Sequence, residues 1–243
     1  MLKLIKGDCL SVMKDLPEGS VDMVLCDLPY GITACKWDSI IPFNALWEQY
    51  NRIIKKDGAV VLFSAQPFTT KLIHSNFNNY RYNWYWKKNN VTGGQFAKVQ
   101  PMRCIEDVCV FYQKKPTYNP QGLVKLATPL KKSSSNSKIY SWGGDKNYTQ
   151  HYTNYPKHLI EFSKDRENYH PTQKPIKLLE YLVKTYTNEG DTVLDNCMGS
   201  GSTGIACLNT GRRFIGIEKA PNYFDIACTR LGEWYMNDDN KAA

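Results

Sequence analysis

Residues 192–218 combine glycines and an acid in a pattern that binds adenosine. Gly199, Gly201 and Gly204 spell GxGxxG after an expected strand and at the start of an expected helix, and Glu218 ends the next strand. Glycines let the backbone approach a ligand closely, and the acid accepts hydrogen bonds from ribose hydroxyls. The alternative is a close-packed strand-to-helix turn without a ligand. The residues after Glu218 suffice for one helix and a tail, so strands from the N-terminal half must complete the sheet.

A second stretch places an acid and an aromatic residue at a strand end. The apolar run from Val21 to Cys26 is followed by Asp27-Leu28-Pro29-Tyr30 and then a glycine. Asp, Pro and Gly are common turn residues, so an ordinary turn after a buried strand is one interpretation. A binding site at the strand end is the other, and this stretch alone does not decide between them.

The elements that must position these residues follow from hydrophobic periodicity. Apolar runs typical of strands buried on both faces alternate with helical spacing, which predicts an α/β fold with a doubly wound, mostly parallel sheet. Expected strands cover 2–5, 21–26, 59–63, 80–86, 104–112, 192–194 and 214–217, with 80–86 and 104–112 antiparallel. Expected helices cover 10–15, 43–54, 67–75, 176–187, 202–209 and 222–235, and the residues 55–58 are interpreted as a helix stop.

Positive charge is concentrated in the middle third of the chain. The net charge is +8, yet residues 81–166 hold 15 Lys and Arg against five Asp and Glu, so the remainder is close to neutral. Regular periodicity is lost over 113–168, where aromatic and amide residues interleave with lysines, and 131–138 is expected to be a loop. We interpret 113–168 as an insertion that binds a polyanion, and 1–112 with 169–243 as the core domain. The alternative for the charged residues is a solvated surface.

Several classes of protein are disfavoured by composition. Eight dispersed cysteines, several within apolar runs, indicate reduced core thiols and a reducing, cytoplasmic setting. The sequence has no CxxC pair and its four histidines lack zinc-like spacing, so we expect no metal. No apolar stretch approaches the roughly 18 residues that span a bilayer, so we expect no membrane association.

Three motifs in a fixed order lead to a family. The tetrapeptide at 27–30, the basic insertion, HPTQKP at 170–175 and DNCMGSGSTG at 195–204 follow one another along the chain. This arrangement resembles the S-adenosylmethionine-dependent DNA amino-methyltransferases of the circularly permuted β class. The resemblance covers nearly all of the chain except about 115–165, the implied target-recognition region. It implies a Rossmann-like class I methyltransferase fold and a prokaryotic or phage enzyme of DNA methylation, as in restriction-modification.

The resemblance also implies roles for individual residues. Asp27 and the Leu28 carbonyl would accept hydrogen bonds from the exocyclic amino group of a base flipped out of double-stranded DNA, and Tyr30 would stack on that base. The amino group is a poor nucleophile, and acceptors on both of its hydrogens favour attack on the methyl sulfonium. Flipping costs unstacking energy that stacking on an aromatic ring partly returns.

The implied residues form three sets. The catalytic set is Asp27, Leu28, Pro29 and Tyr30. The cofactor-binding set is Asp8, Cys9, Asp27, Thr172, Lys174, Asp195, Met198, Gly199, Ser200, Gly201, Glu218 and Lys219. The expected DNA-binding residues are Lys87, Lys88, Arg103, Lys131 and Lys132, with Asn136, Tyr140, Trp142 and Asn147 as candidates for reading bases.

Two positions depart from the family pattern. Leu28 stands where proline is usual, which leaves the carbonyl in place but makes the loop less rigid. Asn196-Cys197 stands where Pro-Phe is usual, so an aromatic contact with the cofactor is absent or comes from elsewhere in the chain.

The substrate remains open between related alternatives. An acid at the first position of the tetrapeptide favours adenine N6, whereas serine there is typical of cytosine-N4 enzymes. A methyltransferase acting on RNA or on a protein amide is a further alternative, as is a DNA-binding module without catalysis. The presence of Asp27, Tyr30 and Glu218 disfavours the last. The sequence leaves open the recognition site, a partner endonuclease and whether the protein forms a homodimer.

Overall fold

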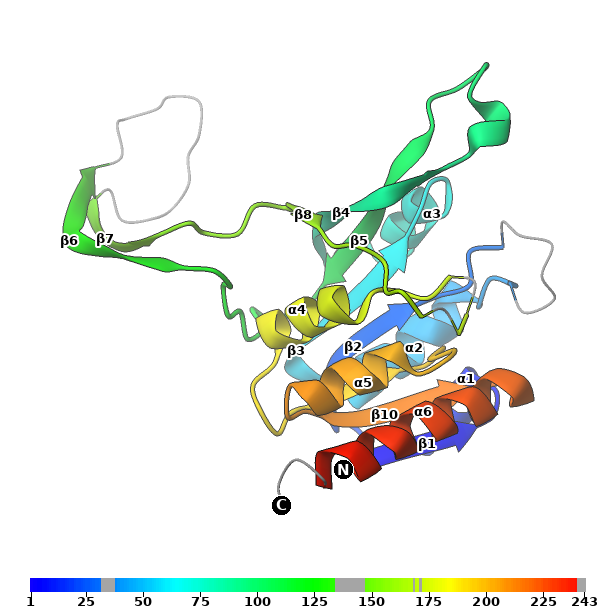
Figure 1. The fold of residues 1–243 in the computed structure, drawn as a ribbon. Coiled ribbons are helices and arrows are strands. Elements are labelled where there is room, and N and C mark those ends of the chain that lie inside the picture. The colour runs from blue at the N-terminus through cyan, green and yellow to red at the C-terminus, as the bar shows by residue number, and fades with distance from the viewer. Residues whose placement is uncertain (32–37, 134–146, 168, 171, 240–243) are drawn as a thin grey trace. The chain divides into compact units, whose positions relative to one another are not determined.

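The computed structural model describes residues 1–31, 38–133, 147–167, 169–170 and 172–239 (Figure 1). Its residues group into two compact units. The first contains Met1–Asn119 and His158–Ala243, and the second contains Pro120–Lys157.

The first unit alternates strands and helices along the chain. Its strands are β1 (Leu2–Lys6), β2 (Val21–Asp27), β3 (Ile54–Ser64), β4 (Tyr80–Thr92), β5 (Arg103–Phe111), β8 (Leu159–Glu161), β9 (Thr192–Asp195) and β10 (Arg213–Glu218). Its helices are α1 (Cys9–Met13), α2 (Phe43–Ile53), α3 (Phe68–Ser75), α4 (Ile176–Tyr186), α5 (Ser202–Asn209) and α6 (Pro221–Asp239), with a 3-10 turn η1 (Gly94–Phe96).

All eight strands form one sheet, in the order β1-β10-β9-β2-β3-β5-β4-β8. The five strands from β1 to β3 are parallel, and β5 is antiparallel to both of its neighbours. The last strands of the chain, β9 and β10, therefore lie between the first two, β1 and β2. This placement confirms that strands from the N-terminal half complete the sheet around the glycine-rich turn.

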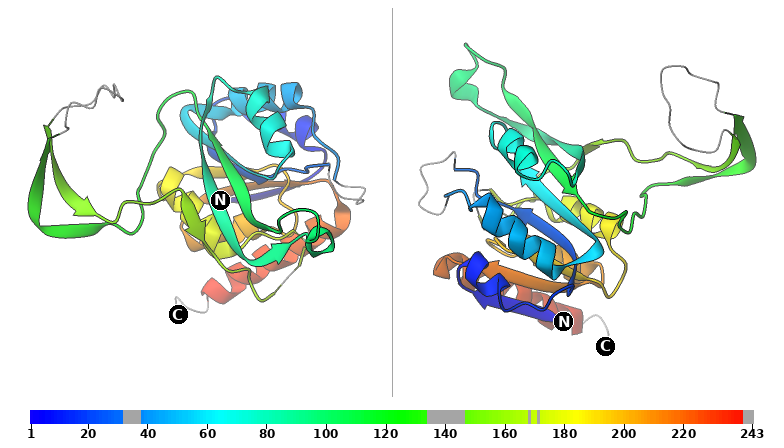
Figure 2. Two further views of the ribbon diagram at one scale, coloured as in Figure 1. Left: turned by 90° about the horizontal axis from the view of Figure 1, so that it is seen from above. Right: turned by 180° about the vertical axis from the view of Figure 1, so that it is seen from behind.

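Helices cover both faces of this sheet, as Figures 1 and 2 show. Successive strand residues point to opposite faces, so Leu25 and Val61 pack with α4, α5 and α6. Cys26 and Leu62 belong to the other core cluster, with α1, α2 and α3. The predicted doubly wound α/β fold is confirmed, and the three layers leave the strand ends free to carry polar residues.

The main differences from the sequence interpretation lie at element ends and in the insertion. Residues 55–58 belong to the start of β3 and not to a helix stop, because α2 already ends at Ile53. Residues 113–168 contain three strands that periodicity does not reveal, and β8 pairs with β4 in the main sheet. Asn119 is likewise tied to the first unit by its N–H, which donates to the Thr185 carbonyl at 2.8 Å. The second unit is accordingly shorter than the predicted insertion.

The second unit is a two-stranded antiparallel ribbon of β6 (Val124–Ser133) and β7 (Asn147–Thr153). Its side chains are largely exposed on both faces, so there is no buried face to impose an alternating apolar pattern. Of the loop expected at 131–138, residues 131–133 instead belong to β6, and residues 134–138 lie outside the described residues. Among the helices that the structure describes, none is long and apolar enough to cross a membrane.

Candidate active site

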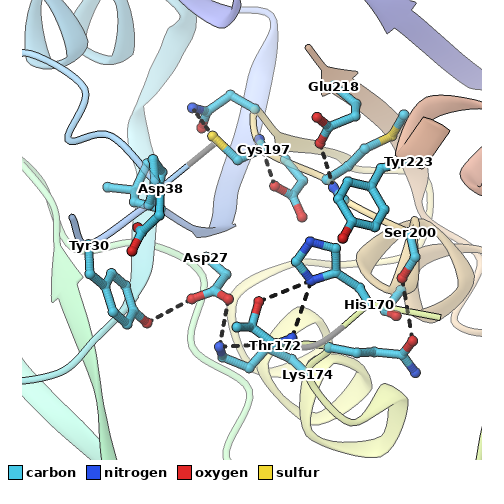
Figure 3. Close-up of a pocket in the computed structure, with 18 of the residues that line it drawn as sticks. Asp27, Tyr30, Asp38, His170, Thr172, Lys174, Cys197, Ser200, Glu218 and Tyr223 are labelled. Carbon is cyan, nitrogen blue, oxygen red and sulfur yellow. Dashed lines mark hydrogen bonds and ion pairs between the residues drawn. The ribbon is translucent and has the colours of Figure 1, made fainter. Parts of the chain in front are cut away.

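The carboxyl ends of the parallel strands open into one cavity of about 680 Å³ in the first unit. Gly7 follows β1, while Glu218, Asp195 and Asp27 end β10, β9 and β2, and all four line the cavity. Open α/β sheets bind ligands at this edge, and the volume is within the range of small-molecule sites. Figure 3 shows side chains from both halves of the chain converging here.

One end of the cavity is built around the carboxylate of Asp27. The Tyr30 hydroxyl donates to Oδ1 of Asp27 at 2.7 Å, and the Lys174 ammonium donates to Oδ2 at 2.6 Å (Figure 3). The Tyr30 ring stacks on Phe68, with centroids 5.0 Å apart and an interplanar angle of 27°. An ionised carboxylate has about four acceptor positions, so Asp27 can still accept a hydrogen bond from a ligand.

Asp27 belongs to a chain of four alternating charges. Lys174 also contacts Glu106 at 3.4 Å, and Glu106 pairs with Lys88 at 3.0 Å. Lys174 and Lys88 are both buried, although lysine is rarely found inside proteins without a partner. The network therefore holds two cations and two carboxylates against one wall of the cavity.

Burial and pairing act in opposite directions on these groups. Burial raises the pKa of Asp27, and Lys174 opposes this rise. Burial acts to raise the pKa of Glu106 as well, but Lys174 and Lys88 outweigh it and the pKa is lowered. Burial acts to lower the pKa of Lys174, and its two carboxylate partners turn this into a raised value. Lys174 consequently stays protonated and supports the charge on both acids.

The other end of the cavity is organised by Glu218. Its carboxylate accepts from the N–H groups of Gly199 at 2.9 Å and Ala220 at 2.7 Å. Gly199 has a φ of 52°, a left-handed conformation that glycine adopts without strain. Glu218 is thus held in one orientation beside the glycine-rich turn, with lone pairs left for a ligand.

Asp195 is buried between the two ends. Its Oδ2 accepts from the Thr203 hydroxyl at 2.6 Å, and its Oδ1 accepts from the Cys197 N–H at 3.1 Å. Burial raises the pKa of Asp195 to about 6, although these hydrogen bonds oppose the rise. These contacts fix the start of the glycine-rich turn to the end of β9.

His170 and Tyr223 provide aromatic surface beside the glycine-rich turn. Their ring centroids are 4.2 Å apart, and both residues line the cavity (Figure 3). Burial and the nearby Lys174 lower the pKa of His170 to about 4, so its imidazole is neutral at neutral pH. Asn196 adds no aromatic surface, and its side-chain oxygen accepts a hydrogen bond from the Tyr50 hydroxyl. The aromatic contact missing at Asn196-Cys197 can therefore be supplied by other elements.

The structure brings most of the candidate residues into this cavity. All four catalytic candidates line it, and so do all cofactor-binding candidates except Gly201. Gly201 caps α5 with a φ of 82°, and a Cβ there would meet Ala227 and Leu231 of α6. Its role is to allow close helix packing.

The DNA-binding candidates are more scattered. Arg103 is exposed at the cavity wall, whereas Lys88 is buried there with its charge on Glu106. Lys87 is half exposed and pairs with Glu161 at 3.0 Å. Lys131 and Lys132 are exposed on β6 and Asn147 begins β7, all in the second unit. The remaining candidates Asn136, Tyr140 and Trp142 lie outside the described residues.

Several cavity residues were not found from the sequence, and three of them carry polar groups that bear on the chemistry. Glu106 lies on β5, Tyr223 lies on α6, and Asp38 accepts a hydrogen bond from the Gly31 N–H at 2.8 Å. Asp38 could have been suspected from its proximity to the tetrapeptide. Glu106 and Tyr223 had no such signal, since only the sheet order and the return of α6 bring them here. No group of His, Cys, Asp and Glu side chains among the described residues is arranged to hold a metal ion.

Comparisons with known proteins agree with this geometry. The family model N6_N4_Mtase, described as DNA methylase, matches residues 21–229. The type II methyltransferase M.HpaI of Haemophilus parainfluenzae is 26% identical over 98% of this chain and 76% of its own length. The DNA adenine methyltransferase YhdJ of Escherichia coli is 27% identical over 94% of this chain and 82% of its own length.

Solved structures share the fold. The complex of M1.HpyAVI with SAM has a TM-score of 0.65 and 25% identity, and the match covers 95% of this chain and 100% of that one. The cytosine-N4-specific PvuII DNA methyltransferase has a TM-score of 0.70 at 17% identity, with 95% and 86% covered.

Proposed function

Because the chain belongs to the N6_N4_Mtase family of DNA methylases, we propose that it transfers a methyl group from S-adenosylmethionine to N6 of adenine in double-stranded DNA. The observation that carries this proposal is the meeting of two distant motifs in one cavity. Asp27 with Tyr30 forms one end, and the glycine-rich turn with Glu218 forms the other. A two-substrate transfer needs such neighbouring sites, because the reacting groups must be held in line.

The residues at the glycine-rich end fit S-adenosylmethionine. Glu218 presents an oriented carboxylate suited to the two ribose hydroxyls, and Gly199 leaves room for a close backbone approach. His170 and Tyr223 add aromatic surface to this part of the cavity. When bound, the cofactor supplies an electrophilic methyl group on its sulfonium.

The residues at the other end fit the amino group of a base. Asp27 would accept a hydrogen bond from the adenine amine, and the Leu28 carbonyl would accept a second. Two acceptors make the nitrogen lone pair more available for attack. Lys174 would keep Asp27 ionised and oriented, a positioning role that adds to its place in the cofactor-binding set. The adenine must leave the duplex to reach this cavity, so base flipping is part of the proposal.

The order of the motifs supports assignment to the circularly permuted β class. The tetrapeptide follows β2, whereas the glycine-rich turn follows β9, yet β2 and β9 are adjacent in the sheet. Strands β1 and β2, which flank the β9–β10 pair in the sheet, thus come early in the chain, and the cofactor-binding turn comes late. We propose that residues 113–168, which include the exposed ribbon of the second unit, contain the target-recognition region.

A nucleoside analysis tests this function. Purified protein would be incubated with methyl-labelled S-adenosylmethionine and duplex DNA, and the digested nucleosides would be identified by mass spectrometry. We expect label in N6-methyladenine and none with the Asp27→Ala variant. Label in N4-methylcytosine would replace the adenine assignment with the cytosine alternative, which the fold also supports. Absence of label in DNA, with label entering RNA or protein, would overturn the DNA substrate.

A further inference from the structure

The hairpin between β4 and β5 extends past the edge of the sheet where the cavity lies. β3 ends at Ser64, which is paired with Asp107, and Asp107 is paired with Tyr85. The rest of β4 and the start of β5 therefore continue beyond the carboxyl end of β3, as Figure 1 shows. We call residues 89–103 the hairpin tip; Gly93 and η1 turn the chain there.

The hairpin tip exposes large apolar side chains. Every residue from 89 to 103 except Gly93 is exposed, including Phe96 at 46%, Val99 at 81% and Met102 at 42%. Apolar side chains that stay in contact with water on a projecting element contribute no burial free energy to the fold. Such a surface is typical of an element that contacts another molecule.

The charge of the hairpin tip is positive. Lys98 and Arg103 are its only charged residues, and its remaining polar residues are amides and one threonine, Thr92. Neither cation forms an ion pair with any residue that the structure describes. Unpaired cations and amides can contact phosphate groups, and apolar side chains can contact stacked bases. The hairpin tip therefore complements a nucleic acid.

The hairpin tip is continuous with the active-site cavity. Thr92 and Arg103, together with Ile105 just beyond the tip, line the same cavity as Asp27 and Tyr30. A base held beside Asp27 leaves its duplex at this rim, so the flanking DNA would meet the hairpin. A second copy of the chain seated here would cover the rim through which DNA has to enter.

On the premise of the proposed function, we propose that the hairpin tip docks on duplex DNA beside the target adenine. Phe96, Val99 and Met102 enter the duplex and fill the space that the flipped base leaves, while Lys98 and Arg103 contact phosphates. Apolar wedges between base steps are a recurring means of holding DNA in an unstacked form. The hairpin tip belongs to the first unit, whereas β6 and β7 belong to the second.

The test compares two duplexes that differ in the cost of flipping. The wild-type protein is first used to map the methylated site, and an oligonucleotide duplex with that site is made in a fully paired form. A second form carries an abasic position opposite the target adenine, which removes its pairing. The variant is Phe96→Ser with Val99→Ser. The control is Phe77→Ser, which makes the same Phe-to-Ser change at a side chain that is 69% exposed and not part of the cavity wall.

We expect the double variant to lose at least about tenfold in single-turnover methylation of the paired duplex, and to return to within about threefold of wild type on the abasic duplex. Phe77→Ser should match wild type on both. Equal losses on both duplexes, or no loss on either, would overturn the wedge role. A shift from dimer to monomer in sedimentation by the double variant would assign the surface to a second copy instead.

A second variant tests the phosphate contact independently. Lys98→Gln should lower the slope of log affinity against log salt by about one unit without changing the methylated site. An unchanged slope would remove Lys98 from the interface. If the wild-type protein methylates no DNA, the proposed function fails; if it methylates DNA and the hairpin variants behave like wild type, only this inference fails.

Discussion

Replacement of Lys174 by methionine tests the charge network more directly than any other single change. Methionine keeps most of the aliphatic length but removes the ammonium that contacts Asp27 at 2.6 Å and Glu106 at 3.4 Å. Lys174 is only 8% exposed, so water cannot easily replace it. The variant leaves Asp27 without its cation, while Glu106 keeps Lys88.

The expected loss of stability is large. Removal of one partner from a buried ion pair typically costs about 3–5 kcal/mol, and the remaining Lys88 places this case near about 3 kcal/mol. The control is Lys177→Met on the same segment. Lys177 is 77% exposed and pairs with Glu180, so its replacement should cost less than about 1 kcal/mol. Urea denaturation of both variants measures the difference.

The pH dependence provides a second readout with opposite signs for stability and activity. Without Lys174 the pKa of Asp27, already raised by burial, should rise further. Methylation by Lys174→Met should then need a more alkaline pH, because the ionised carboxylate is the better acceptor for the amine. The stability of the variant should instead fall as pH rises above the pKa that Asp27 has in the unfolded chain, because folded Asp27 keeps its proton to a higher pH than unfolded Asp27 does.

A double variant checks the mechanism. Adding Asp27→Asn to Lys174→Met removes the carboxylate that has lost its cation, while the Lys88–Glu106 pair stays intact, and should recover part of the lost stability. The reasoning is refuted if Lys174→Met is as stable as Lys177→Met, or if its methylation rate from pH 6 to 9 follows the wild-type profile.

Four further outcomes are expected. Asp27→Ala should abolish methyl transfer while isothermal titration shows cofactor affinity within about tenfold of wild type, and an equal loss of both would mean that Asp27 chiefly holds the cofactor. Glu218→Ala should weaken cofactor binding by about 10–100-fold through lost hydrogen bonds to a charged group, and unchanged affinity would contradict its ribose assignment. Lys131→Ala with Lys132→Ala should flatten the salt dependence of DNA binding by up to about two log-log units without altering the methylated sequence, whereas an unaltered slope would separate these lysines from DNA. The free energy of unfolding of Asp195→Asn should rise relative to wild type by up to about 3 kcal/mol as pH rises from 4 to 7. The reason is that burial disfavours the ionised form of the wild-type carboxylate, whose pKa is about 6, and denaturation curves without this trend would contradict the raised pKa of Asp195.

Local chemistry in the sequence determined the elements and the two ends of the cavity. Apolar runs of strand and helix period predicted α4, α5 and β9 within one or two residues of their observed bounds. The two helices each bury one face against the sheet, and β9 is buried on both of its faces. The tetrapeptide at 27–30 and the acid Glu218 could be found for a similar reason. A residue at the end of a buried strand must lie at an edge of the sheet, where ligands bind.

Tertiary structure alone decided which distant residues meet. Lys174 contacts Asp27 although 147 positions separate them in the sequence. Glu106 on β5 contacts Lys174 as well, and nothing in the residue pattern of β5 indicates this contact. The sequence likewise shows that Lys88 is charged but not that the charge is buried, since burial depends on the strands packed beside it. The exposed ribbon of β6 and β7 was missed because two solvated faces leave no apolar period. Long-range pairing brings these groups together, and no local period in the sequence records it.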